Sequence, residues 1–242
     1  MPSVREFLRA RQGDHALLLL TAEEYSALNK TSELPLPGRH HEHFSRVLRR
    51  SASWPALVGD GTGQLSEAVI EHGKIRLPQP AQNLAIAPRP DSVTIAQAWV
   101  KPKALSLILQ KCAELGVDEI VLFGCERSRE HTEKPQRIDA IIENACMQAY
   151  NPVKPRVRIE TGMDAIAGLA QKRFFGDPES SVWLTPALRR LPTAFVCGPE
   201  GGFSPREAEF LRECGQGVLI SENVLRAETA AIIAAGILCL NR

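Results

Sequence analysis

The sequence has no paired cysteines. Its six cysteines stand singly, so no Cys-x-x-Cys pair supplies the ligand spacing of a zinc site or the spacing of a redox motif. We therefore expect reduced, mostly buried thiols in a cytoplasmic protein, and no metal. These residues are Cys112, Cys125, Cys146, Cys197, Cys214 and Cys239.

Long hydrophobic runs are also missing. Near the N-terminus, residues 17–20 are the only continuous leucine run, which is too short for the apolar core of a secretion signal. The longest apolar stretch, residues 229–240, falls short of the ~20 residues that a membrane span requires. We expect a soluble protein that is neither secreted nor inserted in a membrane.

An excess of one charge is absent as well. The 29 Lys and Arg residues balance 28 Asp and Glu residues, so a surface that binds a polyanion must be local. One basic cluster lies on and before a predicted helix over 42–50, with Glu42 as its single acid. It could bind phosphates or be a solvated helix face, and its histidines lack the partners of a metal site. The cluster comprises Arg39, His40, His41, His43, Arg46, Arg49 and Arg50.

The pattern changes near residue 83, which we take as a boundary between domains 1–83 and 84–242. Before it, short strands are expected at 16–21, 56–59, 65–71 and 74–77, which indicates a small, mostly β module. After it, strands are expected at 92–98, 119–123, 156–160, 181–184, 194–197 and 218–221. Helices are expected between them at 103–115, 135–150, 164–171, 204–215 and 227–240. This alternation predicts an α/β domain with a parallel sheet covered on both faces.

Two loops in the second domain carry the chemistry. The first, Cys-Gly-Pro-Glu-Gly-Gly-Phe-Ser at 197–204, joins a buried strand to a capped helix, and its glycines would let a ligand approach the backbone. It is not the dinucleotide fingerprint Gly-x-Gly-x-x-Gly, which argues against a dinucleotide-dependent oxidoreductase. The second, Leu-Arg-Ala-Glu-Thr-Ala at 225–230, places Arg226 and Glu228 where parallel sheets bind ligands. By themselves the loops are also compatible with a structural turn and a solvated Arg-x-Glu pair.

These loops, with two further motifs, resemble the RsmE-like family of 16S ribosomal RNA (uracil-N3)-methyltransferases, of the SPOUT or α/β-knot class. The third motif runs from Lys101-Pro-Lys103 through Gln110-Lys111 and Glu114-Leu-Gly-Val117 to Glu126-Arg127-Ser128. The fourth is His43-Phe-Ser-Arg-Val-Leu-Arg49 with Gly59-Asp-Gly-Thr-Gly63 after it. The four motifs follow in order over nearly the whole chain.

The resemblance implies a PUA-like RNA-binding β-barrel followed by a trefoil-knotted domain, a homodimer, and S-adenosylmethionine (AdoMet) as methyl donor to 16S ribosomal RNA of the small subunit. It assigns the AdoMet pocket to the two loops, at Cys197, Gly198, Glu200, Gly201, Gly202, Ile220, Ser221, Val224, Leu225 and Arg226. It also implies RNA contacts at Arg46, Arg49, Arg50, Lys101, Lys103 and Lys111.

The sequence departs from the family pattern in three places. Residues 221–223 lack a usual basic residue, Met147 replaces a usual acid, and residues 22–38 are expected to be an added loop. The first two departures motivate an alternative, a non-catalytic RNA-binding or ribosome-assembly protein that kept the fold.

Methylation at uracil N3 requires removal of the imide proton and a cation near the carbonyls. Arg226 is our candidate for that cation, because a guanidinium stays charged and can contact two acceptors. Glu200 and Glu228 are the candidates for accepting the proton or for orienting Arg226. Two alternatives remain open: the carboxylates could instead stabilise helix starts, and a water molecule could accept the proton.

Overall fold

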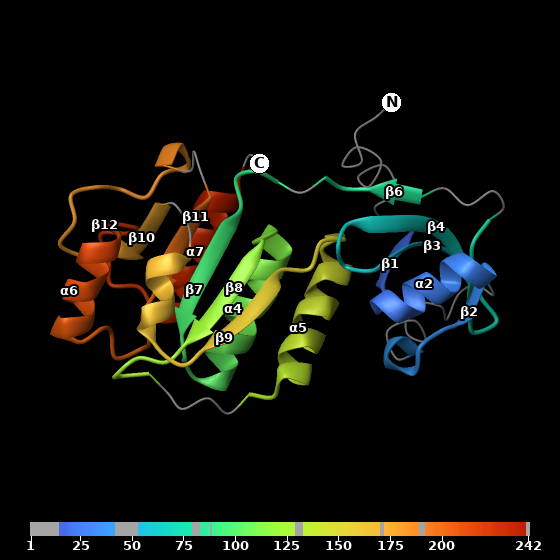
Figure 1. Cartoon of the computed structure of the whole chain (residues 1–242), viewed down its shortest axis with the longest axis horizontal. Coiled ribbons are helices and arrows are strands. Elements are labelled where there is room, and N and C mark those ends of the chain that lie inside the picture. Colours follow the sequence, from blue (N-terminus) through green and yellow to red (C-terminus); the bar gives the residue numbers. More distant parts are fainter. Residues whose placement is uncertain are drawn as a thin grey trace. The chain divides into compact units, whose positions relative to one another are not determined.

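The computed structural model describes residues 15–41, 53–78, 83–87, 89–128, 133–169, 172–188 and 192–240. The chain divides into two compact units, drawn in Figure 1. The first comprises Met1–Pro88 with Cys146–Val153, and the second Arg89–Ala145 with Lys154–Arg242. The predicted helix over 42–50, with Arg46, Arg49 and Arg50, lies outside the described residues.

The first unit is built on a mostly antiparallel sheet. Its strands are β1 (Ala16–Leu19), β2 (Glu33–Pro35), β3 (Ser53–Gly59), β4 (Gln64–Glu71), β5 (Lys74–Arg76) and β6 (Asn83–Ala85). The order is β1-β3-β4-β5-β2, with β6 paired to β4 and only β1 and β3 parallel. Leu17, Leu57 and Leu65 are fully buried at its core. The four strands predicted in this part of the chain are confirmed.

The prediction of a loop over residues 22–38 is wrong, because α2 (Ala22–Thr31) and β2 occupy most of it. Thr21 caps the helix: its hydroxyl accepts from the Glu24 amide at 3.2 Å, and the Glu24 carboxylate accepts from the Thr21 amide at 2.9 Å. Tyr25 and Leu28 face the core, and the Tyr25 hydroxyl lies 2.9 Å from the Ser66 hydroxyl. This capping box is the sequence signal for the helix.

The described part of the basic cluster is engaged within the first unit. Arg39 donates to the Glu24 carboxylate at 2.8 Å, and this bond is the main reason that the pKa of Glu24 is lowered to about 2. His40 is buried, and a ring nitrogen of His41 lies 2.9 Å from the Leu36 carbonyl. Arg39 therefore does not offer an unpaired charge to a phosphate.

The second unit contains a parallel six-stranded sheet in the order β12-β10-β11-β7-β8-β9. The strands are β7 (Val93–Ala98), β8 (Glu119–Phe123), β9 (Arg156–Glu160), β10 (Lys172–Gly176), β11 (Thr193–Cys197) and β12 (Gln216–Val218). All neighbouring strands are parallel. The predicted α/β class and parallel sheet are thus confirmed.

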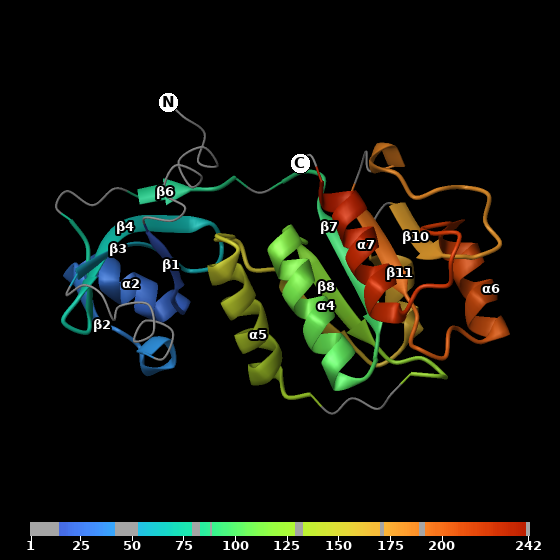
Figure 2. The ribbon, with the colours of Figure 1, turned by 180° about the vertical axis from the view of Figure 1, so that it is seen from behind.

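Helices cover both faces of this sheet, as predicted. On one face α7 (Ala227–Cys239) packs on β11 and β7 and beside α4 (Pro102–Leu115), as Figure 2 shows. On the other face the short helix η2 (Met163–Gly168) contacts α6 (Pro205–Cys214). Phe123, Ile166 and Leu211 belong to the buried core on that second face. Helix α5 (Pro135–Gln148) connects β8 to β9.

One predicted strand is misplaced. Residues 181–184 form no strand: Trp183 makes a single bridge to Leu219, and its side chain is 46% exposed. The strand on this side of the sheet is instead β10, which lies between β11 and the edge strand β12 and was not predicted. The helix predicted over 164–171 is the short 3-10 helix η2, and the strand predicted over 218–221 lies at 216–218.

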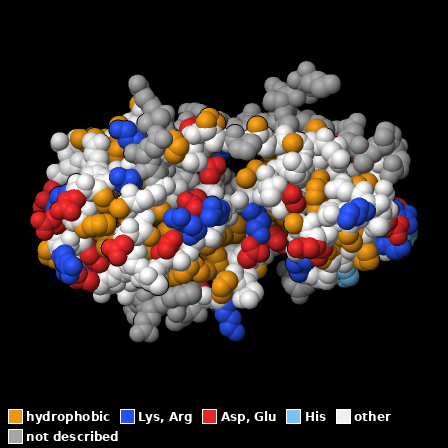
Figure 3. All heavy atoms as spheres, viewed as in Figure 1, with side chains coloured by type: hydrophobic (Ala, Val, Ile, Leu, Met, Phe, Trp, Pro, Cys, Tyr) orange, Lys and Arg blue, Asp and Glu red, His pale blue; other side chains and the backbone are white. Residues whose placement is uncertain are grey.

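Lysines and arginines are intermixed with aspartates and glutamates on the face seen in Figure 3, in keeping with a net charge of +1. Within the parallel sheet, Arg158 lies 3.4 Å from a Glu119 carboxylate oxygen on the neighbouring strand. None of the described helices is long and apolar enough to cross a membrane.

Candidate active site at the carboxyl edge of the parallel sheet

A cavity of about 1190 Å³ opens where the direction of strand addition changes. From the central strand β7 the chain adds β8 and β9 on one side, whereas β11 lies on the other side of β7. The loops after β7 and β11 therefore diverge, and a crevice forms at the carboxyl ends of the two strands. The cavity is lined by the loops that follow β7, β10 and β11, by the start of α7 and by part of α6.

The first glycine-rich loop, residues 198–203, forms one wall of the cavity. It follows Cys197 at the end of β11, and burial raises the pKa of that thiol, so Cys197 is a neutral, packed side chain. At its other end Ser204 caps α6: the hydroxyl accepts from the Glu207 amide at 3.3 Å, and the Glu207 carboxylate accepts from the Ser204 amide at 2.8 Å. The loop is thus held between a central strand and a capped helix.

The glycines of this loop serve different purposes. Gly202 has φ +68°, which disfavours residues with a side chain, and no atom lies within 4 Å of the place a Cβ would take. At Gly198 a Cβ would lie 3.1 Å from the Phe203 ring, and at Gly201 it would lie 3.3 Å from Arg127 Cβ. The expectation that glycines open the backbone to a ligand therefore fits Gly202, whereas Gly198 and Gly201 admit close packing within the protein.

The second loop runs from β12 to α7 and brings Leu225, Arg226 and Val224 to the cavity. Val224 is 95% exposed. Arg226 is the N-cap residue of α7, and in the described part of the chain its guanidinium has neither a hydrogen bond nor an ion pair. Ile220 and Ser221 do not line the cavity; the Ser221 hydroxyl accepts from the Asn223 amide at 3.0 Å and shapes the loop.

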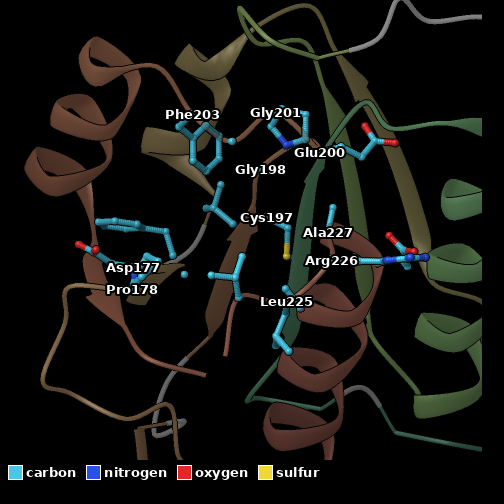
Figure 4. Close-up of a pocket in the computed structure, with 18 of the residues that line it drawn as sticks. Asp177, Pro178, Cys197, Gly198, Glu200, Gly201, Phe203, Leu225, Arg226 and Ala227 are labelled. Atoms are coloured by element: carbon cyan, nitrogen blue, oxygen red, sulfur yellow. The ribbon is translucent and has the colours of Figure 1, made fainter. Parts of the chain in front are cut away.

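The two candidate carboxylates differ in their surroundings. Glu200 accepts a hydrogen bond from the Lys101 amide at 3.0 Å, so one of its oxygens satisfies a donor at the start of α4. Glu228 lies in the first turn of α7 and also lines the cavity. In Figure 4, Glu200 and Arg226 extend to one side of the view, and Phe203 and Asp177 lie toward the other.

Three lysines were predicted to contact RNA. Lys101 and Lys103, at the start of α4, are exposed and line the cavity. Lys111 lies outside it, and its ammonium group is 2.8 Å from both carboxylate oxygens of Glu114. Besides Arg212 of α6, which lies 3.9 Å from an Asp177 carboxylate oxygen, the cations that line the cavity are Lys101, Lys103 and Arg226, here called the cationic rim.

A whole wall of the cavity was missed, because it follows the unpredicted strand β10. This wall includes Phe175, Gly176, Asp177, Pro178 and Glu179. The Asp177 carboxylate accepts from the Glu179 amide at 3.0 Å. The signal in the sequence is the pair Phe-Phe followed by Gly-Asp-Pro, an apolar run that ends in turn residues. Among the described residues there is no group of three or more potential metal ligands.

The sequences of two curated relatives align with most of this chain. The ribosomal RNA small subunit methyltransferase E of Aquifex aeolicus is 27% identical over 183 residues, 72% of this chain and 75% of that protein. The enzyme of the same name from Rickettsia conorii is 24% identical over 220 residues, 86% of this chain and 90% of that protein.

The fold is shared with a solved structure. The ribosomal RNA small subunit methyltransferase E of Neisseria gonorrhoeae, bound to S-adenosyl methionine, matches 91% of this chain and 95% of its own with a TM-score of 0.73 and 24% identity. The family model of the RNA methyltransferase domain matches residues 87–239, which span the parallel sheet and both loops of the cavity. This chain belongs to that RNA methyltransferase family.

Proposed function

We propose that this protein transfers a methyl group from AdoMet to N3 of a uridine in 16S ribosomal RNA of the small subunit. The observation that carries the proposal is the convergence of both signature loops on one cavity at the switch point of the sheet. The names of the curated relatives supply the ribosomal RNA substrate, and the motif resemblance supplies the position on the base. Such a protein would act in the cytoplasm.

The cavity suits AdoMet in size and chemistry. Its volume of about 1190 Å³ exceeds the several hundred Å³ of a typical small-molecule site, which leaves room for a base beside the methyl donor. Phe203 and Leu225 offer apolar surface, and the open space above Gly202 leaves the loop backbone accessible. We assign the pocket to both loops, with Ile220 and Ser221 supporting the second loop from outside the cavity. When bound, AdoMet supplies an electrophilic methyl group.

The residues of the chain then have separate tasks. Arg226, whose guanidinium at the cavity has no partner among the described residues, stabilises the negative charge on the uracil ring after the imide proton leaves. Glu228 accepts that proton. Glu200 holds the start of α4 through the Lys101 amide, and so positions the lysines of the rim. Lys101 and Lys103 attract the phosphates that flank the target base.

The first unit serves as a PUA-like RNA-binding β-barrel, and residues 84–242 form the SPOUT domain, whose last segment threads a trefoil knot. The path of the chain supports the proposal of a knot. It returns from the edge strand β12 to the central strands, where α7 packs on β11 and β7. Arg46, Arg49 and Arg50 are proposed RNA contacts on sequence grounds. Lys111 is left out of this surface because it is paired with Glu114.

Two chains form a homodimer through the second unit. The dimer is what the family resemblance implies, and the exposed apolar side chains of this unit include Leu107 on α4 (39%) and Val224 before α7 (95%). Light scattering at micromolar concentration should give twice the monomer mass. A stable monomer would contradict this part of the proposal.

The activity is tested with labelled AdoMet and small subunits from a strain that lacks the modification. Label should enter 16S ribosomal RNA, and nucleoside analysis should identify 3-methyluridine. Subunits from a strain that has the modification are the matched control, because their site is already methylated and should take up no label. Calorimetry with AdoMet separates the alternative: a non-catalytic RNA-binding protein with a decayed pocket would bind no AdoMet and transfer no label.

A further inference from the structure

The loop 198–203, here called the glycine loop, is fastened to a turn that lies outside the cavity wall. This turn, residues 125–128, follows β8 and contains the Glu126-Arg127-Ser128 motif. The Arg127 guanidinium donates through one nitrogen, Nη1, to the Gly201 carbonyl at 3.2 Å and to the Phe203 carbonyl at 3.3 Å. The motif therefore contacts the glycine loop although Arg127 does not line the cavity.

The 125–128 turn is rigidly built. The Ser128 amide and the Ser128 hydroxyl both donate to the Cys125 carbonyl, at 3.0 and 2.9 Å, and the Cys125 amide lies 3.0 Å from the same hydroxyl. Before it, Gly124 is packed so closely that a Cβ would lie 2.6 Å from the Thr161 carbonyl oxygen. Arg127 therefore projects from a fixed backbone.

A buried carboxylate joins this turn to the far end of the glycine loop. Glu207 is 8% exposed, and one of its oxygens accepts from the Glu126 amide at 2.7 Å. Its other oxygen accepts from the Ser204 amide at 2.8 Å. The Glu207 carboxylate thus binds both the 125–128 turn, next to Arg127, and the end of the glycine loop.

Arg127 holds two peptide groups whose other ends are also fixed. The Gly201 carbonyl shares a peptide plane with the Gly202 amide, which donates to the Pro199 carbonyl at 3.0 Å. The Phe203 carbonyl shares a plane with the Ser204 amide, which donates to Glu207. Because a peptide group is planar, fixing both ends sets the orientation of the backbone between them. A charged donor also makes a stronger hydrogen bond than a neutral one.

We propose that Arg127 is a positioning residue that holds the glycine loop in the shape that binds the methyl donor. The inference rests on the proposed function for the identity of the ligand, whereas the contact with the loop is independent of it. An exposed arginine near an RNA-binding cavity could instead contact a phosphate, and the experiment separates these roles.

Amide hydrogen exchange without any ligand tests the contact. In Arg127→Met, peptides that cover residues 200–204 should exchange roughly tenfold faster than in the parent protein, because a hydrogen bond from a charged donor is lost. Arg127→Lys should recover part of the protection, since an ammonium group is also a charged donor but is more strongly hydrated and sits on a shorter side chain. The control is Arg137→Met, which removes an exposed arginine on α5, 3.4 Å from Glu133.

Calorimetry with AdoMet tests the consequence. Affinity should fall roughly tenfold in Arg127→Met and less in Arg127→Lys, with kcat at saturating AdoMet changed much less than KM for AdoMet. Combining Arg127→Met with Gly201→Ala should give a smaller loss than the product of the single losses, because both changes disturb the same contact between residues 127 and 201.

The outcomes are distinguishable. Unchanged exchange and unchanged AdoMet affinity in Arg127→Met would overturn the proposal, and if RNA affinity alone fell, Arg127 would be a phosphate contact. A parent protein that binds no AdoMet would instead refute the proposed function. In that case the exchange experiment, which needs no ligand, would still decide whether Arg127 fixes the loop.

Discussion

Replacing Arg226 by methionine should remove turnover without removing the fold. The side chain is exposed and has no partner among the described residues, so its loss leaves no buried group unpaired. The first hydrogen bond of α7 uses the backbone: the Ala230 amide donates to the Arg226 carbonyl at 2.9 Å, and methionine keeps that carbonyl. We expect the free energy of unfolding to change by less than ~0.5 kcal/mol.

The magnitude of the kinetic effect follows from the charge. Losing one donor to an anion that develops in the transition state costs a factor of about 100 to 1000 in kcat, or roughly 3 to 4 kcal/mol. Methionine retains the apolar length of the side chain, so packing around Leu225 is preserved. AdoMet affinity should therefore change less than about threefold, and the loss should appear in the chemical step.

Single-turnover methylation at saturating AdoMet and RNA measures this step directly. Arg226→Lys is the matched variant: it keeps a positive charge without the two-pronged geometry and should retain an intermediate rate. Near-normal turnover in Arg226→Met would refute the assignment, and the cation would then be sought at the other members of the rim. A loss of AdoMet binding equal to the loss of rate would show that Arg226 serves the pocket instead.

Other perturbations have distinct expected results. Gly201→Val should weaken AdoMet binding in calorimetry by about tenfold or more, because a Cβ there would already lie 3.3 Å from a neighbouring side chain. Reversing charge at Lys101 and Lys103 should weaken RNA binding and flatten its salt dependence in filter binding, and leave AdoMet affinity unchanged. Glu24→Gln should destabilise the fold by about 0.5 kcal/mol near neutral pH, because the ion pair with Arg39 is solvent-exposed. Since the pKa of Glu24 is lowered from 4.5 to about 2, denaturation curves of parent and variant should differ above pH 4.5 and converge as the pH falls toward 2.

The parts of the fold that the sequence predicted well are those with a single strong pattern. Strands β8 and β9 were predicted with the bounds they have, and α4 ends at Gly116, which adopts the left-handed conformation expected of a helix stop. The capping box at Ser204 likewise begins α6. In each case local chemistry and burial favour the same structure.

The missed elements are those whose signals conflict. Helix α2 stops at Ser32, with φ 60°, where glycine would have marked the end, and only Tyr25 and Leu28 are buried on its face. Strand β10 begins with Lys172 and Arg173, so its apolar part is only Phe174 and Phe175. It is a strand because its neighbours β11 and β12 pair with it on both sides, which no local window contains.

The site shows the same division between local and distant information. The two loops were identified because their glycines and charges are contiguous in the chain, and eight of the ten residues assigned to the pocket line the cavity. What local sequence cannot give is which segments meet the loops from elsewhere. Residues 175–179, which include Asp177, lie at the cavity because β10 pairs with β11 in the sheet. Arg127 contacts the Gly201 carbonyl although the two residues are 74 positions apart in the sequence. The Arg127 side chain, whose Cβ lies 3.3 Å from the place a Cβ at 201 would take, gives a reason within the protein for a glycine there, which the loop sequence alone attributes to the ligand.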